Sequence, residues 1–496
     1  MAKSSYDRKD DVVISTVYLY TPDSVIDLLS GNFVKEIFVY ENLLDTFYSG
    51  SITLVDTKAI FEALDMSENC FIAMTFRTPL PSDTPDGSGG VVDPDKTSNP
   101  VTYLFRIDKT TSRTSPPKQA GEFIHLHMTS LSGFLDDISL RSKSYKGNAV
   151  TLIQQIASQS FYDKNDPANT SLETVNLPLP DFNSIATKNL GTQEVFDYTT
   201  SPYTFFEMKT GSQSEEFTKY SFPFCKASEK INEFCDELRD TKGNTGFCFW
   251  ETRTGFKLAS RQSLFEQKPV ITLVKSFVNN RLFDESIGPL LNIYNMDDFE
   301  IGGANNRRRQ MAQGGLQSSM YVYDITKKNW YRRNFSYETD NVYSSSVIPG
   351  RFPVVSASSS DPRFIDVVDG VSKIIMKDSA SSRFNTTFFG DTPDEDTYGH
   401  EENAQSALSQ RVMESDIYIE VNMSGNHFIE AGDTVQCVFP SIDRNKNMSE
   451  ELSTTYLVRN VSHTFDFITK SHRMKLGLIR NFKTKPNATV LLSPEN

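Results

Sequence analysis

The sequence predicts a mainly β protein in which an α+β module separates two antiparallel β regions. Three observations support this prediction. The 36 phenylalanines and 20 tyrosines supply most of an aromatic content of 12%, and aromatic residues favour strands. Segments in which apolar and polar residues alternate lie towards both ends of the chain, separated by turn residues. Between them, two segments carry apolar residues at helical spacing.

Length and charge limit the possible classes of protein. With 496 residues, the chain exceeds the ~100–200 residues of an ordinary domain, so we expect several domains. Its 64 acidic and 50 basic residues give a net charge of −14, opposite in sign to that of a general nucleic-acid or membrane-surface binder. No apolar run approaches the ~18 residues of a membrane-spanning helix. Residues 1–12, the expected N-terminal arm, contain no signal peptide. We expect a soluble protein without membrane insertion.

The first β region is expected at 13–145. Residues alternate from Lys35 to Tyr40, with Ile37 and Val39 on one face, and Ser51–Asp56 follows after a turn as a paired strand. The other predicted strands are Phe71–Phe76, Tyr103–Ile107 and Glu122–Thr129. Residues 79–100 are rich in Pro, Gly, Ser and Asp and are predicted to form a loop insert.

The middle α+β domain is expected at 146–289. Asn148 is a predicted cap for a helix that carries Val150, Ile153 and Ile156 on one stripe. A second helix is predicted from Ser228 to Arg239. A hairpin follows, with arms Gly246–Glu251 and Phe256–Ser260 around a turn at 252–255.

The second β region is expected at 290–344 and 401–485. Its predicted elements are strands at Met320–Ile325 and Trp330–Tyr337, a helix near Glu401–Val412, and strands at Ile417–Met423, Thr455–Phe465 and Met474–Ile479. Alternation in Thr455–Phe465 places Leu457, Val461 and Phe465 on one face. Residues 345–400 form a long insert poor in regular pattern, and 486–496 form a polar tail.

No set of residues predicts an active site. His125 and His127 share one face of a strand, but no third metal ligand lies at a recognised spacing. Asp136-Asp137 and Asp394–Asp396 are interpreted as solvated charge, and Gly302-Gly303 is too weak a signal for a phosphate site. The motifs of P-loop, serine-hydrolase and zinc-protease enzymes are missing. We therefore predict no catalytic, cofactor-binding or metal-binding residues, no cofactor and no enzymatic activity.

One basic segment leaves two interpretations open. Basic residues with aromatic residues between them suit nucleic acid, and they suit an acidic protein surface equally well. The residues concerned are Arg307–Arg309, Lys327, Lys328, Arg332 and Arg333, with Trp330 and Tyr331 between the later pairs.

Near the C-terminus the sequence resembles a known family. Leu408–Arg411, Ile417–Val421 and Gly425–Pro440 resemble the closing barrel of the central hub proteins of phage baseplates. Ile37–Asp56 is similar to the opening barrel of that family. Arg141–Gly147 before a helix is similar too, as is the Gly314-Gly315 turn that leads to Tyr323-Asp324 and Phe335–Tyr337. Ser67–Asn69 departs from the glycine turn usual in the family, and the inserts 79–100 and 345–400 have no counterpart.

The resemblance implies two similar antiparallel β-barrel domains of the tail-tube type in one chain, and a trimer that forms a pseudo-six-fold ring. It implies a virion structural protein, the central baseplate hub of a contractile tail. Such a hub joins the three-fold central spike to the six-fold tail tube and lines the channel for DNA ejection. The implied partners are the spike, tail-tube or tube-initiator proteins, the tape-measure protein and the baseplate wedges, with DNA only as passing cargo. The implied location is the tail baseplate, after assembly in the host cytoplasm.

Two alternatives remain. One is a tail spike or tube-initiator component of a related contractile injection system, including the spike of a type VI secretion system. The other is a carbohydrate-binding β protein, because aromatic-rich β domains often hold sugars.

Overall fold

The computed structural model describes the greater part of the chain, and the statements below concern those residues. Residues 79–99, most of 345–400 and the tail 486–496 lie outside them. So do Ser67–Asn69, Arg307–Arg309, Lys327, Lys328 and Asp394–Asp396. The described ranges are 12–21, 24–57, 70–78, 100–114, 121–165, 203–210, 217–221, 224–275, 295–302, 317–324, 329–336, 374–378, 400–414, 418–441 and 452–480, with the single positions 10, 212, 214, 313, 314, 448 and 449.

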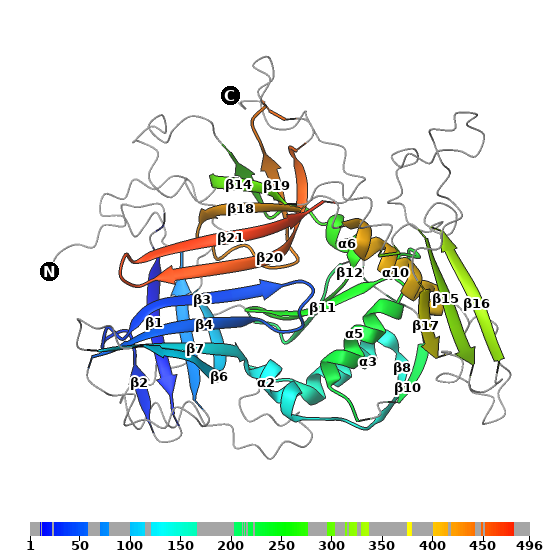
Figure 1. Cartoon of the computed structure of the whole chain (residues 1–496), viewed down its shortest axis with the longest axis horizontal. Coiled ribbons are helices and arrows are strands. Elements are labelled where there is room, and N and C mark those ends of the chain that lie inside the picture. The colour runs from blue at the N-terminus through cyan, green and yellow to red at the C-terminus, as the bar shows by residue number, and fades with distance from the viewer. Residues whose placement is uncertain are drawn as a thin grey trace.

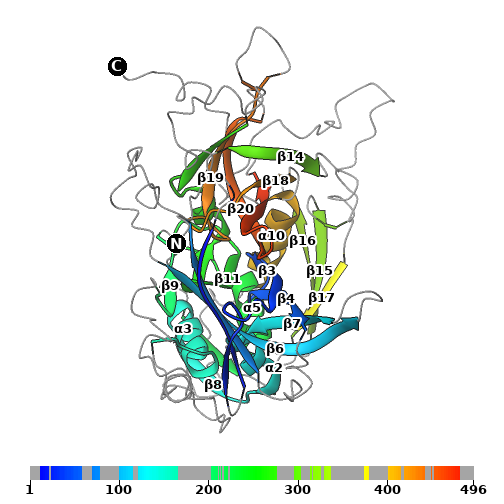
Figure 2. The same ribbon diagram turned by 90° about the vertical axis from the view of Figure 1, so that its left-hand side faces the viewer.

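A large, almost entirely antiparallel sheet dominates the fold (Figure 1), which confirms the prediction of a mainly β protein. The sheet has 13 strands, ordered β14-β18-β21-β20-β3-β4-β7-β6-β5-β1-β2, with β19 and β13 attached beside β20. It divides into two halves that each surround a separate apolar core. In Figure 2 the second half lies above the first, and the helices α2 and α3 lie at the lower end.

The first sheet half consists of the N-terminal strands. Alternation along them places one face in the core, since Ile37 is 1% and Val39 0% exposed while Phe38 between them is 37% exposed. Every strand predicted in 13–145 is present. The strands are β1 (Val13–Tyr20), β2 (Val25–Asp27), β3 (Val34–Asn42), β4 (Ser49–Asp56), β5 (Phe71–Arg77), β6 (Val101–Thr114) and β7 (Glu122–Ser130).

The second sheet half encircles its own core. Its ladder runs β14-β18-β21-β20-β19-β13, and a bridge from Val274 to Asn295 returns from the end of β13 to the residue before β14. Phe299 and Phe439 meet inside it with ring centroids 4.7 Å apart. The strands are β13 (Ile271–Val274), β14 (Met296–Gly302), β18 (Tyr418–Ser424), β19 (Thr434–Val438), β20 (Thr454–Asp466) and β21 (Ser471–Ile479).

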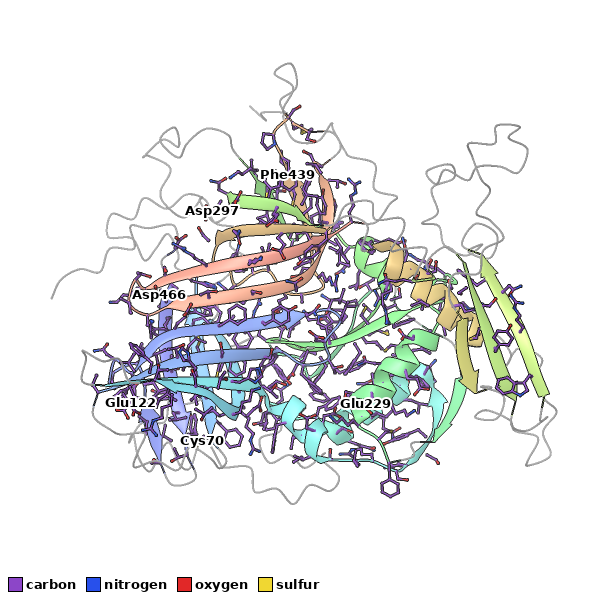
Figure 3. All side chains as sticks on the ribbon, in the orientation of Figure 1. Cys70, Glu122, Glu229, Asp297, Phe439 and Asp466 are labelled. Carbon is purple, nitrogen blue, oxygen red and sulfur yellow. The ribbon has the colours of Figure 1, made fainter. Side chains whose placement is uncertain are left out.

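Strand β20 belongs to both halves. Residues 454–457 pair with β19, whereas 460–466 pair with β3. A bulge at Arg459 separates the two stretches, and the Arg459 carbonyl accepts the Leu43 N–H at 2.7 Å. Asp466 at the end of β20 and Glu122 at the start of β7 lie at the same end of the sheet (Figure 3).

The bulge overturns one expectation about β20. Strict alternation placed Leu457 and Val461 on one face and Val458 on the other. In the structure Val458 and Val461 lie in the same core, that of the second half, and Leu457 packs elsewhere. The extra residue of the bulge shifts the alternation by one position, so every side chain beyond it changes face.

The middle module (residues 144–265) packs beside the first half. Asn148 caps α3 as predicted, because its Oδ1 accepts the Val150 N–H at 3.0 Å. The predicted hairpin is β11 paired with β12. The elements are β8 (Ser144–Asn148), α3 (Ala149–Ser160), β9 (Phe206–Met208), β10 (Phe217–Ser221), α5 (Ala227–Glu237), β11 (Phe247–Thr252), β12 (Gly255–Ser260) and α6 (Arg261–Phe265), and α2 (Leu131–Ile138) connects them to β7.

A small outlying sheet stands at the far side of the molecule (Figure 1). Here β15 (Gln317–Asp324) pairs with β16 (Asn329–Ser336) and with β17 (Ile374–Asp378). Helix α10 (His400–Glu414) lies between this sheet and α5, and Gln405 Nε2 donates to Ser318 Oγ at 3.2 Å.

The strand pairing differs from the expected grouping in three places. Within 290–344, β14 joins the second half, but β15 and β16 form the separate outlying sheet. Strand β17 lies inside the insert that was expected to be irregular, and β13 joins the second half although 146–289 was expected to be the middle domain. The physical reason is common to all three. Alternation identifies a strand, but the choice of partner depends on packing between segments distant in sequence.

Phe465 tests the sharing of β20, because its ring lies in the core of the first half although its strand also serves the second. Phe465→Ala should lower the free energy of unfolding by about 3–5 kcal/mol, the usual cost of emptying a buried aromatic site. Denaturant unfolding followed by tryptophan fluorescence measures this. Ile468→Ala, at a side chain 72% exposed, is the control and should stay within about 0.5 kcal/mol of the parent. Equal effects of the two substitutions would contradict the shared role of β20.

Candidate functional site

Four charged side chains meet in the interior where the two sheet halves and the middle module join. Glu41 comes from β3, Arg253 and Lys257 from the β11–β12 hairpin, and Glu430 from the loop between β18 and β19. Their exposures are 0, 5, 5 and 4%. Buried charges are costly unless they are paired and hydrogen-bonded. We call these four residues the junction.

Glu430 is the centre of the junction. Its Oε2 accepts hydrogen bonds from the Thr252 and Thr254 hydroxyls at 3.1 and 2.9 Å, and from Lys257 Nζ. Its Oε1 lies 3.2 Å from Arg253 Nη2. All of these partners belong to the β11–β12 hairpin, so the carboxylate fixes the loop of the second half against the middle module.

Arg253 and Glu41 extend the network in two directions. Arg253 donates from Nη1 to the Ile429 carbonyl at 3.2 Å and from Nη2 to the His427 carbonyl. Its backbone N–H donates to Glu41 Oε1 at 3.3 Å. The Tyr103 hydroxyl also donates to Glu41 Oε1, at 2.7 Å. One guanidinium side chain therefore links the middle module to the loop of the second half, while its backbone contacts the first half.

Burial and pairing act on the pKa values in opposite directions. Burial alone raises the pKa of Glu430, but the Arg253 and Lys257 cations more than offset this and hold it well below its usual range. For Glu41, burial prevails over the nearby Arg253 and the pKa is raised. Burial also lowers the pKa of Arg253, and the Glu430 carboxylate more than restores it. Glu430 and Arg253 are therefore a true buried ion pair.

Apolar packing supports the charged network. The Trp250 indole N–H donates to the Ala431 carbonyl at 2.9 Å, and the ring is fully buried. Gly432 has φ +89°, and a Cβ at this position would lie 2.3 Å from the Trp250 ring. The turn therefore requires glycine both for its backbone angle and for the close approach of the indole.

Two further buried ionisable groups, Lys164 and Glu251, lie where the middle module meets the first half. Burial lowers the pKa of Lys164 to about 8 and raises that of Glu251 to about 8. Lys164 Nζ donates to the Thr102 carbonyl on β6 at 3.2 Å, and the Glu251 N–H donates to the Thr46 carbonyl at 2.8 Å. These contacts attach the segment that follows α3, and β11, to the first sheet half.

The predicted features elsewhere have structural partners. Thr53 Oγ1 lies 2.9 Å from His125 Nδ1, and Asp108 Oδ2 lies 3.1 Å from His127 Nδ1. The interpretation of Asp136 as solvated charge is wrong, since it is only 2% exposed. Its carboxylate accepts from the Ser228 N–H at 3.1 Å and from the Ser228 hydroxyl, at the N-terminus of α5, where a carboxylate is favoured. Among the described residues, no group of three or more His, Cys, Asp or Glu could hold a metal ion.

The basic segment is described in part. Trp330 is 53% exposed. Arg332 is exposed, its guanidinium lies 5.7 Å from the centre of the Tyr321 ring, and its Nη2 donates to Ser319 Oγ at 3.0 Å. The side chains of Tyr331 and Arg333 are outside the described part. Among the described residues, no helix is long and apolar enough to cross a membrane.

The junction was missed at the sequence level, although one of its residues carried a signal. Glu41 lies two residues beyond Val39 and four beyond Ile37, which are both buried. Alternation along the strand therefore places the Glu41 carboxylate on the same, apolar face. A charge on such a face requires a buried partner. No comparable pattern pointed to Arg253, which lies in a turn, or to Glu430, which lies in a loop.

Comparison with known proteins gives likeness in structure only. No model of a known protein family matches the chain, and no curated protein matches it. Among solved structures, a tail protein from Neisseria meningitidis is 9% identical with a TM-score of 0.47, covering 95% of this chain and 98% of its own. The 43 kDa tail protein of prophage MuSo2 from Shewanella oneidensis is 10% identical with a TM-score of 0.45, covering 96% and 100%.

A third similar structure belongs to a secretion system. The E. coli c3393 protein, a component of the type VI secretion system, is 8% identical with a TM-score of 0.35, covering 90% of this chain and 73% of its own. These structural neighbours are thus two tail proteins, one of them from a prophage, and a component of a type VI secretion system. All three TM-scores are below 0.5, so these structures describe what the chain is similar to, and its function is not inferred from them.

Removing one charge tests the junction. Glu430→Gln should lower the free energy of unfolding by about 3–5 kcal/mol at pH 7, because Arg253 and Lys257 would remain buried without their counter-charge. Denaturant unfolding measures the loss. The control is Glu266→Gln, since the pair that Glu266 forms with Lys242 at 2.6 Å is largely exposed. That substitution should cost less than about 1 kcal/mol. A loss as small at Glu430 would show that the junction does not hold the modules together.

Proposed function

We propose that this chain is a virion structural protein, the central baseplate hub of a contractile phage tail, acting as a homotrimeric symmetry adaptor. The observation that carries the proposal is the fusion of two strand sets, each around its own core, into one sheet through β3 and β20. In this proposal the two sheet halves are the two tube-type barrels of the chain.

The strand paths support the barrel assignment. In the second half six strands run around the core, and the Val274–Asn295 bridge joins the first to the last. In the first half the strand order begins at β3 and ends at β2, and both ends contribute to one core, with Ile37 on β3 buried in it and Ile26 on β2 packed against it. Curling a sheet onto itself also removes exposed strand edges, which a chain so rich in strands must protect.

Symmetry explains why one chain would carry two such units. Three chains in cyclic symmetry present six strand sets around one axis, so a three-fold spike can be joined to a six-fold tube. The adaptor works only if the two sets keep a fixed relative orientation. The junction supplies this constraint, since Glu430 and Arg253 connect the second half to the middle module and Glu41 connects that module to the first half.

The order of family-like segments along the sequence supports the same assignment. The proposed partners are the central spike and the tail-tube or tube-initiator proteins, with the tape-measure protein and baseplate wedges nearby. We place the protein in the tail baseplate of the virion, after assembly in the host cytoplasm, with a structural and not an enzymatic role. DNA is passing cargo, and the net charge of −14 disfavours its retention in the channel.

A second candidate function rests on the outlying sheet. Trp330 is 53% exposed there, and Arg332 lies over Tyr321 beside it. An exposed indole beside hydrogen-bonding groups suits the stacking of a sugar ring. A glycan array with the full chain tests this function. Binding that disappears in Trp330→Ala would support a carbohydrate-binding protein, and the absence of binding would eliminate it.

Assembly tests the hub proposal. Mass photometry of the full chain should show a species of about 168 kDa, three times the 56.0 kDa of one chain, and co-expression with a central spike protein should give a heavier complex that contains this trimer. Negative-stain images of the sample should show rings. Glu430→Gln should lower the trimer fraction because it loosens the orientation of the two halves, and Glu266→Gln should leave the fraction unchanged. A monomer in both samples would contradict the proposal.

A further inference from the structure

Three of the six histidines lie together in the interior, between the two sheet halves. His427 is in the loop between β18 and β19, His463 is on β20 and His472 is on β21. Their exposures are 4, 0 and 1%. The ring centroids of His463 and His472 are 5.1 Å apart, and His463 Nδ1 lies 3.0 Å from His472 Nε2. We call these three residues the histidine cluster.

The histidine cluster contacts the end of β5 in the first half. The centroid of the Phe76 ring lies 5.5 Å from the ring centroid of His472 and 6.3 Å from that of His463. Thr78, just beyond β5, lies against His427, and Phe465 stacks on His472 at 4.2 Å. The cluster thus fills the space where the loop 425–433 and the β20–β21 hairpin of the second half meet the first half.

Hydrogen bonding fixes His427 in its neutral form. The Thr78 backbone N–H donates to His427 Nδ1 at 3.0 Å. That nitrogen must therefore keep its lone pair, and the single ring proton sits on Nε2. The Thr78 hydroxyl also contacts Nδ1, and it accepts the His427 backbone N–H at 3.2 Å. A proton on Nδ1 would displace the Thr78 backbone N–H and leave the Thr78 hydroxyl as its acceptor, which weakens the contact between the loop and β5.

His463 also has no place for an extra proton. One proton lies between His463 Nδ1 and His472 Nε2, because that contact requires one donor and one acceptor. His463 Nε2 is buried and has no hydrogen-bond partner among the described residues. A second proton on His463 would therefore give a buried N–H without an acceptor, which is costly.

The charged groups around the cluster oppose protonation on balance. Arg253 from the β11–β12 turn faces all three rings, and Arg77 at the end of β5 faces His427. Glu430 acts in the other direction on His463, but Arg253 and Lys257 bind its carboxylate. The Asp10 carbonyl accepts the His472 backbone N–H at 2.7 Å, and the Asp10 carboxylate accepts from the Ser424 hydroxyl.

We propose that the histidine cluster is an acid-sensitive latch between the two sheet halves. Uptake of protons by His427, His463 and His472 releases the loop 425–433 and the β20–β21 hairpin from the end of β5. Return to neutral pH restores the contact. The ligand of this site is the proton, and its effect is a change in how firmly the two halves are held together.

We call the latch closed when the loop 425–433 and the β20–β21 hairpin contact the end of β5. The pKa values of the histidines in this closed state determine how the stability of the latch changes with pH. Burial, and after it the charge of Arg253, lowers the pKa of His427 to about 3, and burial likewise lowers that of His463 to about 3. The pKa of His472 is also held well below its usual range, first by burial. An opened histidine takes up a proton near pH 6.5. The closed latch is therefore fully stable above about pH 6.5 and loses stability as the pH falls below it.

Nearby carboxyl groups do not produce the same effect in this range. The pKa of Glu430 is lowered, so its contribution is lost only below the ordinary glutamate value of about 4.5. The pKa values of Glu41 and Glu251 are raised by burial. Their protonation in the folded state favours that state as the pH falls, which opposes opening. Loosening between pH 6.5 and 4.5 therefore reports the histidines.

Amide hydrogen exchange on the full chain tests the latch, with rates corrected for the intrinsic effect of pH. Between pH 6.5 and 5, protection in 425–433 and 76–78 should fall by about tenfold or more, since each coupled histidine contributes up to about tenfold per pH unit. The variant H463N/H472Q keeps amide groups at the two bonded positions and leaves only His427 of the cluster to titrate, so the loss of protection should be much smaller. The control H125Q/H127Q, on β7, should behave as the parent.

Exchange of the histidine C2 protons in the unaltered protein gives a test that does not require the variant to fold. His427, His463 and His472 should remain neutral at pH 5 while the latch is closed and should become reactive only as amide protection is lost. His127, whose side chain is 43% exposed, is the solvent-exposed reference. Three results would overturn the latch: constant protection from pH 7.5 to 4.5, equal loss in parent and H463N/H472Q, or cluster histidines that titrate near 6.5 in the closed state.

Discussion

The structure depends on the requirement that buried charges be paired. Glu430 and Arg253 are within 5% of complete burial and 3.2 Å apart, yet they come from different modules. Burying either charge without the other would cost several kcal/mol of folding free energy. The second sheet half and the middle module therefore must dock in one arrangement to bring the two charges together. Glu41 extends the same requirement to the first half.

Apolar packing alone would not define this arrangement so closely. Three separate cores, those of the two sheet halves and the middle module, could each form and then slide on their neighbours. The junction allows one relative position, because hydrogen bonds to Glu430 must be made by Thr252, Thr254 and Lys257 together. The close contact of Gly432 with Trp250 sets the same position sterically. In the symmetry adaptor that we propose, this rigidity would transmit the geometry of one partner to another.

Strand β20 provides the second link between the halves. Its two ends pair with strands of different halves, and the bulge at Arg459 is the point of transfer. The histidine cluster lies along the same contact, on β20, β21 and the neighbouring loop. The buried ion pair of Glu430 and Arg253 and the histidine cluster thus occupy one region. Arg253 belongs to both, since it pairs with Glu430 and repels a charge on the histidines.

Local patterns in the sequence determined the elements but not their partners. Alternation identified β3, β4 and β21, and the helical stripe with its Asn148 cap identified α3, because these signals come from residues within one segment. The same patterns placed β15 and β16 in the wrong sheet, missed β17 and reversed a face of β20. The position of Glu41 on an apolar face indicates a buried charge, but it does not indicate which residue pairs with that charge. Only the tertiary structure decided that Arg253, from a turn 212 residues away, would meet it. Pairing across such distances depends on how whole modules pack, and no local pattern encodes that.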